Sequence, residues 1–311
     1  MSFIRLQERI DKLKNPTVVG LDPDLAHIPD YILEKHISSH GETLEAAALA
    51  VFDFNSGLID ALCDIVPAIK PQSAYYEALG PYGNLSLSKT CDYAKKKGMY
   101  VILDGKRNDI GSTAAAYSAA YLGTVKVGNA EHMPYCVDAL TVNAYLGSDG
   151  IKPFIEDAVK YDKAIFALVK TSNPSAGELQ DKIIKTEEPS PCPSVYTMVG
   201  ELIEEISKDT IDKFGYTCVG AVVGATYPEE TKFLREKLKH TFFLVPGYGA
   251  QGGSASDAAN AFDKDGRGAI VNSSRGIIAA WKKSNGDYAA AAREEAIKMR
   301  DELREVLKTL H

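Results

Sequence analysis

Eight short runs of apolar and mainly β-branched residues recur along this chain, and stretches with helical periodicity separate most of them. Strands that are apolar on both faces and alternate with helices are typical of a parallel sheet covered by helices. Right-handed crossovers then leave two common arrangements, an open doubly wound sheet and a closed barrel, and eight repeats favour the barrel. The predicted strands are Thr17–Leu21, Ile65–Lys70, Tyr100–Asp104, Ala139–Asn143, Ala164–Lys170, Val219–Val223, Phe242–Val245 and Gly268–Asn272.

The length of 311 residues fits one α/β domain, because (β/α)₈ TIM barrels often reach this size as a single unit. No linker rich in Pro, Gly or Ser divides the chain, so we expect one domain over residues 1–311 with helices at its C-terminal end. The longest irregular stretch, Asn173–Pro193, predicts an active-site loop in its near half and a surface insertion in its far half. The predicted helices are Leu44–Leu62, Leu85–Lys97, Ile151–Tyr161, Tyr196–Phe214, Glu229–Leu238 and Tyr288–Leu310.

Composition limits the classes of function. The net charge of −7 and the pI of about 5.5 argue against a nucleic-acid partner, although a local cationic pocket for one small anion is compatible with both. The five cysteines are far apart and form no C-x-x-C pair, so we expect buried thiols rather than disulfides or a zinc site. No apolar run approaches the roughly 20 residues of a membrane helix, and the first eight residues do not resemble a signal peptide. We therefore expect a cytoplasmic protein with no membrane association.

Polar residues follow the ends of the predicted strands. The carboxyl ends of all strands of a (β/α)₈ barrel meet at one face, where active sites of this fold lie, so these side chains are expected to gather there. Each one alone also fits a cap or a turn, and for Asn143 we prefer a helix-capping loop and leave it out of the predicted site. The residues concerned are Asp22, Lys70, Asp104, Asn143, Thr171, Ser172 and Arg275.

The segment Asp104–Thr113, with the sequence DGKRNDIGST, carries the densest charge pattern. Strand alternation places Asp104 and Lys106 on the same side, and charges are rarely buried unless they are paired. Lys70, one strand over, would add a second cation, and Asp109 would extend the array to Lys–Asp–Lys–Asp. The spacing alone leaves two interpretations open, a catalytic array and an ordinary cluster of ion pairs.

The same segment resembles the whole signature D-x-K-x-x-D-I-G-x-T of the orotidine 5′-monophosphate decarboxylase family, in a divergent branch with longer inserts. This resemblance implies a cofactor-free (β/α)₈ barrel, with no metal, that converts orotidine 5′-monophosphate to uridine 5′-monophosphate and CO₂. Five further segments resemble the family in the same order, namely Val19–Pro23, Ala68–Pro71, Val169–Pro174, Pro246–Gly253 and Val271–Gly276.

The resemblance also implies roles for four charged residues. Lys106 would lie beside C6 of the pyrimidine, stabilise the carbanion left by CO₂ and deliver the proton. Asp104 would lie near the substrate carboxylate and orient Lys106; the contribution of ground-state destabilisation to such a reaction is contested. Lys70 would hold the network and a ribose hydroxyl, and Asp22 would accept from the ribose.

A homodimer follows from the resemblance as well, because the family residues that match Asp109 and Thr113 reach into the neighbouring subunit's site. Thr171 and Ser172 would meet the pyrimidine edge, although turn chemistry explains Thr171 equally well.

The phosphate end also has a general physical basis. Barrels often bind phosphate with the loops after strands seven and eight, and glycines let backbone N–H groups approach an anion closely. Within the segment Pro246–Gly253, Gln251 can donate its amide, and Arg275 can make a bidentate contact. A Gly-rich surface turn is the competing interpretation. The same segment formally matches the dinucleotide fingerprint, but Asp263 and Asp265 precede the next strand, where that fingerprint needs an acid at the strand's end.

Two other functions stay open on sequence. A magnesium-dependent sugar-phosphate decarboxylase or aldolase of the same suprafamily shares D-x-K-x-x-D but carries a metal-binding Glu at the end of strand two, where this chain has Lys70. A non-catalytic nucleotide-binding barrel is the third candidate, because a fold alone does not secure a function.

Overall fold

A closed barrel of eight parallel strands forms the centre of the molecule. The computed structural model describes residues 2–185, 192–249, 252–283 and 286–309. Around the barrel the strands follow the order β1, β10, β9, β8, β7, β6, β3 and β2, and each neighbouring pair is parallel. The bounds are β1 Thr17–Leu21, β2 Ala68–Pro71, β3 Tyr100–Arg107, β6 Ala139–Val142, β7 Ala164–Lys170, β8 Val219–Val223, β9 Phe243–Val245 and β10 Ala269–Ser273.

The predicted (β/α)₈ fold is therefore confirmed, and three of its strands have the predicted bounds. The main differences lie at strand ends. The strand β3 continues to Arg107, past the predicted end at Asp104, and its register against β6 shifts between Leu103 and Arg107. The strand β2 begins at Ala68 instead of Ile65, because Ile65 belongs to the turn after α3 and the N–H groups of Ile65 and Val66 both donate to the Leu62 carbonyl.

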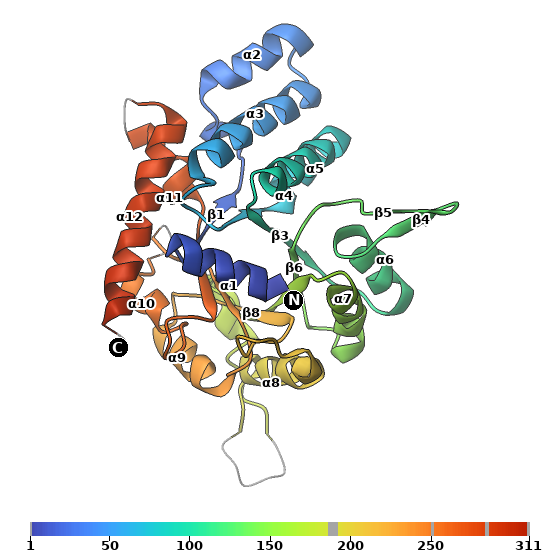
Figure 1. Cartoon of the computed structure of the whole chain (residues 1–311), viewed down its shortest axis with the longest axis vertical. Helices are drawn as coiled ribbons and strands as arrows, with labels where there is room; N and C mark the ends of the chain where they lie inside the picture. The colour runs from blue at the N-terminus through green and yellow to red at the C-terminus, as the bar shows by residue number, and fades with distance from the viewer. Residues whose placement is uncertain (1, 186–191, 250–251, 284–285, 310–311) are drawn as a thin grey trace.

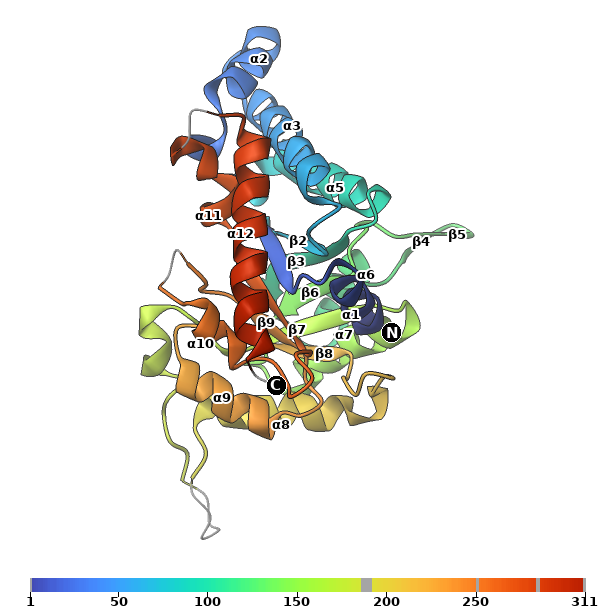
Figure 2. The same ribbon diagram turned by 60° about the vertical axis from the view of Figure 1, so that its left-hand side comes forward.

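Helices cover the barrel and are seen around it in Figures 1 and 2. Several begin with a side chain that caps backbone N–H groups; Thr43, Ser194 and Asp287 all do so. The main ones are α1 Ser2–Leu13, α2 Asp30–His40, α3 Leu44–Leu62, α4 Ser73–Glu77, α5 Gly80–Lys96, α6 Gly111–Tyr121, α7 Ser148–Lys160, α8 Val195–Ser207, α9 Pro228–Lys237, α10 Ala255–Ala259, α11 Arg275–Ile278 and α12 Tyr288–Lys308.

Two features after β3 had no counterpart in the sequence prediction. The helix α6 is rich in Ala, Ser and Tyr and has no continuous apolar stripe, so its pattern is weak. It is followed by a hairpin of β4 (Val125–Val127) and β5 (Ala130–His132), whose residues are all exposed. Figure 1 shows this hairpin extending away from the barrel.

The helix α1 closes the barrel at the end opposite the carboxyl ends of the strands. The Phe3 ring stacks on Phe242 with centroids 4.9 Å apart and contacts Phe166 at 5.0 Å. The fully buried carboxylate of Asp138 ties the same end together, because it accepts hydrogen bonds from Arg5 and Lys95 at 2.7 Å. Aromatic packing and a buried ion cluster therefore form the floor of the barrel, remote from its mouth.

In the part of the chain that the structure describes, no helix is long and apolar enough to cross a membrane.

Truncating Phe3 tests whether α1 stabilises the barrel. The Phe3→Ala variant should lose about 3–5 kcal/mol of unfolding free energy, because a buried aromatic is removed and the cavity refills only in part. Urea denaturation measures the loss, and the exposed Tyr31→Ala serves as the control. A loss below about 1 kcal/mol would mean that the floor contributes little.

Candidate functional site

A cavity of about 580 Å³ opens at the carboxyl ends of the barrel strands. Polar side chains from six strand ends or the loops after them line it, as the sequence predicted, and apolar residues such as Leu168 and Val222 form part of its base. This position is where (β/α)₈ enzymes carry out their chemistry. The predicted residues that line the cavity are Asp22, Lys70, Asp104, Lys106, Thr171, Pro246 and Arg275.

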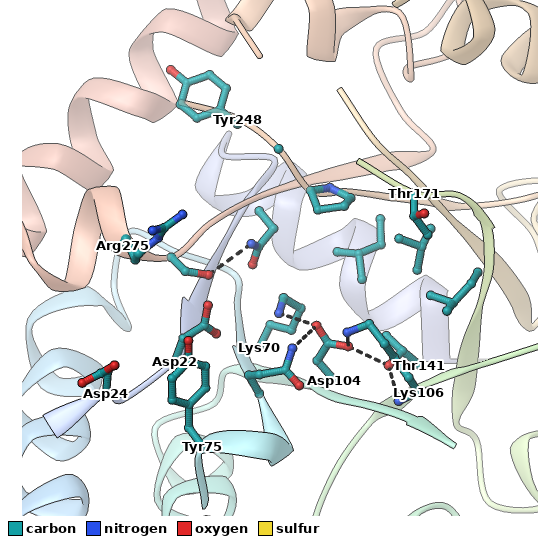
Figure 3. A pocket seen from close by; sticks show the side chains of 18 of the residues that line it. Asp22, Asp24, Lys70, Tyr75, Asp104, Lys106, Thr141, Thr171, Tyr248 and Arg275 are labelled. Carbon is teal, nitrogen blue, oxygen red and sulfur yellow. Dashed lines mark hydrogen bonds and ion pairs between the residues drawn. The ribbon is translucent and has the colours of Figure 1, made fainter. Parts of the chain in front are cut away.

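Asp104 is the centre of the polar network in this cavity (Figure 3). Lys70 Nζ donates to its Oδ2 at 2.7 Å, and Lys106 Nζ donates to its Oδ1 at 2.6 Å. Gln72 Nε2 and the Thr141 hydroxyl add two more donors, at 3.0 and 2.9 Å. Each carboxylate oxygen thus receives two hydrogen bonds, and one of each pair comes from a charged ammonium.

Electrostatics keep this array charged at neutral pH. Burial favours the neutral form of Asp104, but the ammonium groups of Lys70 and Lys106 outweigh it and hold the pKa of this carboxyl well below its ordinary value. Burial also opposes the charge on Lys70, yet Asp104 and Asp22 raise the pKa of Lys70 above its ordinary value. The cavity therefore contains a fixed sequence of cation, anion and cation.

The two lysines differ in their access to the cavity. The Lys70 side chain is 6 % exposed, whereas that of Lys106 is 46 % exposed. The Lys106 backbone has a φ of +45°, and its N–H donates to the Thr141 hydroxyl at 2.9 Å. A non-glycine residue in this region is strained and is held there by its surroundings. Both lysines line the cavity, and Lys106 is the more accessible of the two.

Sequence reasoning missed Gln72 and Thr141, which both hold Asp104. Thr141 lies on β6 beside Asp104, because Leu103 and Leu140 are register partners. The only sequence feature that could have indicated Thr141 is that it is the single polar residue in the otherwise apolar strand ALTV. Gln72 follows β2 directly and pairs with Asp104 through an isolated bridge, which only the pairing between strands could reveal.

Two buried oxygen atoms in the cavity wall lack partners among the described residues, Asp22 Oδ1 and Asn272 Oδ1. Buried polar atoms are rarely left unpaired in native proteins, so each such atom calls for a ligand or a water molecule. Both are acceptors and therefore suit a donor such as a hydroxyl group.

At the end of β7 the structure places Thr171, and not Ser172, in the cavity wall. The reason is a register shift against β8 between Leu168 and Lys170, which moves the alternation of side chains by one residue. The Thr171 N–H donates to Gln180 Oε1 at 2.9 Å, and its hydroxyl accepts from Gln180 Nε2 at 2.7 Å. Gln180 is a third residue that the sequence did not indicate.

The Gly-rich segment after β9 and the start of α11 bound one side of the cavity. Pro246 and Gly247 line it, and Gly247 has a φ of +98°, a conformation that other residues rarely adopt. Arg275 is exposed and lies between this cavity and a neighbouring one of about 740 Å³. The predicted phosphate ligand Gln251 lies outside the described residues.

Asp109 and Thr113 do not line the cavity of their own chain. Asp109 is half-buried and accepts from the Ile110 N–H at 2.8 Å, and Thr113 is exposed on α6. Within one chain the array is therefore Lys–Asp–Lys, and the predicted fourth charge lies away from it. Among the described residues, no group of three or more His, Cys, Asp or Glu side chains is arranged to hold a metal ion.

Comparison with known proteins assigns the family. A protein from Rhodopirellula baltica named orotidine 5′-phosphate decarboxylase is 43% identical and covers 96% of this chain and 98% of its own. One of the same name from Caldicellulosiruptor bescii is 42% identical over 89% of both chains. A crystal structure of a putative orotidine-monophosphate decarboxylase from Toxoplasma gondii, 29% identical, superposes with a TM-score of 0.79 over 99% of this chain and 96% of its own. Residues 48–291 match the model of one family, and the chain belongs to it: the orotidine 5′-phosphate decarboxylase / HUMPS family.

Proposed function

We propose that this protein decarboxylates orotidine 5′-monophosphate to uridine 5′-monophosphate, a step of pyrimidine biosynthesis, without a metal or an organic cofactor. The observation that carries the proposal is the buried Asp104 carboxylate between Lys70 and Lys106, at the mouth of a barrel whose relatives bear that activity in their names. The cavity of about 580 Å³ is large enough for a nucleotide.

Lys106 is the group that would act on the reacting carbon. Loss of CO₂ leaves an electron pair at C6 of the pyrimidine that the ring cannot delocalise well. A fixed ammonium next to that carbon stabilises the developing charge and then delivers its proton to C6. The ion pair with Asp104 and the bond from its N–H to Thr141 hold Lys106 in place before substrate arrives, so little reorganisation is needed during the reaction.

Asp104 would face the carboxylate that leaves. Its four hydrogen bonds keep it ionised, so an anionic substrate group beside it is repelled until CO₂ departs. Lys70 offsets the buried charge and would bind ribose hydroxyls together with Asp22 Oδ1, which has no partner among the described residues.

The two ends of the nucleotide would lie on opposite sides of this array. The Ser172 hydroxyl has no hydrogen-bond partner in the described part of the chain, whereas Thr171 is engaged by Gln180. Thr171 lines the cavity with its hydroxyl oriented by Gln180, so it would meet the pyrimidine edge, and the neighbouring Ser172 would add a second hydroxyl. On the other side, Pro246, the backbone of the Gly-rich segment, Gln251 and Arg275 would hold the phosphate, whose binding energy can be used at the distant reacting carbon.

The magnesium-dependent sugar-phosphate reaction is the alternative within this family. That chemistry requires a carboxylate at the end of the second barrel strand, and the ammonium of Lys70 occupies this place, 2.7 Å from Asp104. A divalent cation there would be repelled.

Asp109 and Thr113 would serve the site of a second subunit. Asp109 lies just before α6 and Thr113 in its first turn, both outside the cavity of their own chain, and the exposed Ile110 between them supplies apolar surface for a subunit contact. We therefore propose a homodimer in which each subunit completes the other's site, and we place it in the cytoplasm, where the pyrimidine nucleotide would be used.

An ultraviolet assay with orotidine 5′-monophosphate and excess chelator tests the activity. The wild-type protein should remove the orotate absorption with chelator present. The Lys106→Ala variant should lose about 10³-fold or more in kcat/KM, because it lacks both the stabilising charge and the proton donor. The surface variant Lys208→Ala should keep full activity. Chelator-sensitive turnover, or an active Lys106→Ala variant, would contradict the proposal.

The stability that Asp104 provides should depend on pH. Its pKa is lowered in the folded protein, so the contribution is complete above the unfolded value of about 3.9 and is lost as the pH falls toward the folded value. The Asp104→Asn variant mimics the protonated acid, and at pH 7 it should be about 3 kcal/mol less stable than the wild type. Urea denaturation between pH 7 and pH 3 should show this gap closing below about pH 4; a gap that does not depend on pH would contradict the ionised network.

Mixing two inactive variants tests the exchange of Asp109 between subunits. A heterodimer of Lys106→Ala and Asp109→Ala has one site with both residues intact if Asp109 acts in the partner's site. Refolding the two together in equal amounts should then restore about a quarter of the wild-type activity, the statistical yield for a two-fold dimer. Each variant refolded alone is the control. No recovery, with heterodimers shown to form, would place Asp109 in its own subunit's site.

A further inference from the structure

The first half of the insert after β7 is tied to the cavity wall by three side chains. Gln180 and Asp181 lie in the insert, just after the 3₁₀ helix Pro174–Glu178, and Lys170 is the last residue of β7. Their bonds converge on the strand end that carries Thr171 and Ser172. We call Lys170, Gln180 and Asp181 the Thr171 latch.

Lys170 is a lysine whose charged side chain is buried in the protein interior, where charges seldom occur. Its side chain is fully buried, and its ammonium forms an ion pair with Asp181. The rings of Tyr227 and Tyr196 lie 4.2 and 5.3 Å from Nζ, in cation–π contact. A buried ammonium is tolerated only when it is paired, so Lys170 requires the insert to fold back onto the barrel.

The register shift against β8 explains why Lys170 points this way. Regular alternation would turn Lys170 to the same side as Leu168, which lines the cavity. The shift between these two residues instead directs Lys170 toward α8 and the start of α9, where Tyr196 and Tyr227 lie, and directs Thr171 to the cavity. The ion pair with Asp181 therefore stabilises the register that presents Thr171.

Gln180 then fixes Thr171 itself. Its amide bonds the Thr171 N–H and the Thr171 hydroxyl at once, at 2.9 and 2.7 Å, and the hydroxyl donates onward to Asn173 Oδ1 at 2.6 Å. The base of the insert is held in turn, because the Tyr196 N–H donates to the Gln180 carbonyl at 3.0 Å.

We propose that Gln180, Lys170 and Asp181 are positioning residues for substrate, and that they set the Thr171–Ser172 segment against the pyrimidine without touching it. The insert is then a part of the binding apparatus. This inference rests on the proposed function for its kinetic consequence, although the latch itself can be measured without substrate.

Gln180→Ala is the direct test, with Glu178→Ala as its matched control. Both side chains lie in the same insert, and Glu178 is exposed. The Gln180→Ala variant should raise KM for orotidine 5′-monophosphate about tenfold, because two hydrogen bonds that order the segment are lost, while kcat changes much less. Glu178→Ala should leave both constants unchanged. Gln180→Glu, which keeps an acceptor for the Thr171 N–H, should recover part of the loss.

Lys170→Met removes the ion pair without leaving a buried charge unpaired. Methionine can fill the space between the two tyrosines, and Asp181, whose side chain is 45 % exposed, stays hydrated. The variant should remain as stable as the wild type and yet show a raised KM. The reverse change, Asp181→Ala, would leave the ammonium buried and unpaired, so its unfolding would not be informative.

Amide hydrogen exchange separates this inference from the proposed function. In Gln180→Ala, exchange at Thr171 should be about tenfold faster than in the wild type, with no such change in Glu178→Ala. If the wild type does not decarboxylate orotidine 5′-monophosphate, the proposed function fails, and the exchange rates alone decide on the latch. Unchanged exchange at Thr171, or a wild-type KM in both Gln180→Ala and Lys170→Met, overturns it.

Discussion

The buried carboxylate of Asp104 is the group on which the mouth of this barrel depends. A carboxylate with so little exposure persists as an anion only when cations and donors surround it. This requirement explains why donors from three strands meet at Asp104. Lys70 comes from β2 and Gln72 follows it directly, Lys106 comes from β3, and Thr141 comes from β6. Three adjacent strands are thus held in one relative register by a single charge.

Lys70 and Lys106 have the same functional group but different roles in this arrangement. Lys70 is almost completely enclosed and balances the charge of Asp104, whereas Lys106 reaches into the cavity from a backbone conformation that few residues adopt. A reactive ammonium must be both restrained and accessible. The bond from the Lys106 N–H to Thr141 meets the first requirement without covering the side chain.

Sequence reasoning predicted the barrel and the first three members of the Lys–Asp–Lys–Asp array, because these depend on local patterns, whereas Asp109 lies away from the cavity of its own chain. Apolar runs with clear ends located β1, β7 and β8 to the residue, and the spacing of Asp104 and Lys106 predicted their contact. What escaped prediction depends on how strands pair. Thr141 and Gln72 reach Asp104 through the register of neighbouring strands, which one sequence does not reveal.

Strand register also explains why simple alternation could not decide between Thr171 and Ser172, since the register shift in β7 changes which of them faces the cavity. The weak pattern of α6 hid a helix for a different reason, because alanine and serine carry little periodic signal.

The pairing of the first strand with the last has a consequence for how the protein folds on the ribosome. Thr17 is the register partner of Val271, and the ring of Phe3 rests on Phe242. Neither contact can form until most of the chain has been synthesised, so the edge of β1 that faces β10 stays unpaired until then, although its other edge can pair with β2 early. Contacts between residues so distant in sequence slow folding, and they prolong the lifetime of aggregation-prone intermediates with exposed apolar surface. We expect barrel closure to be a late and cooperative event, and truncation at the C-terminal side of β9 to leave one edge of β1 unpaired, because β10 is its partner there.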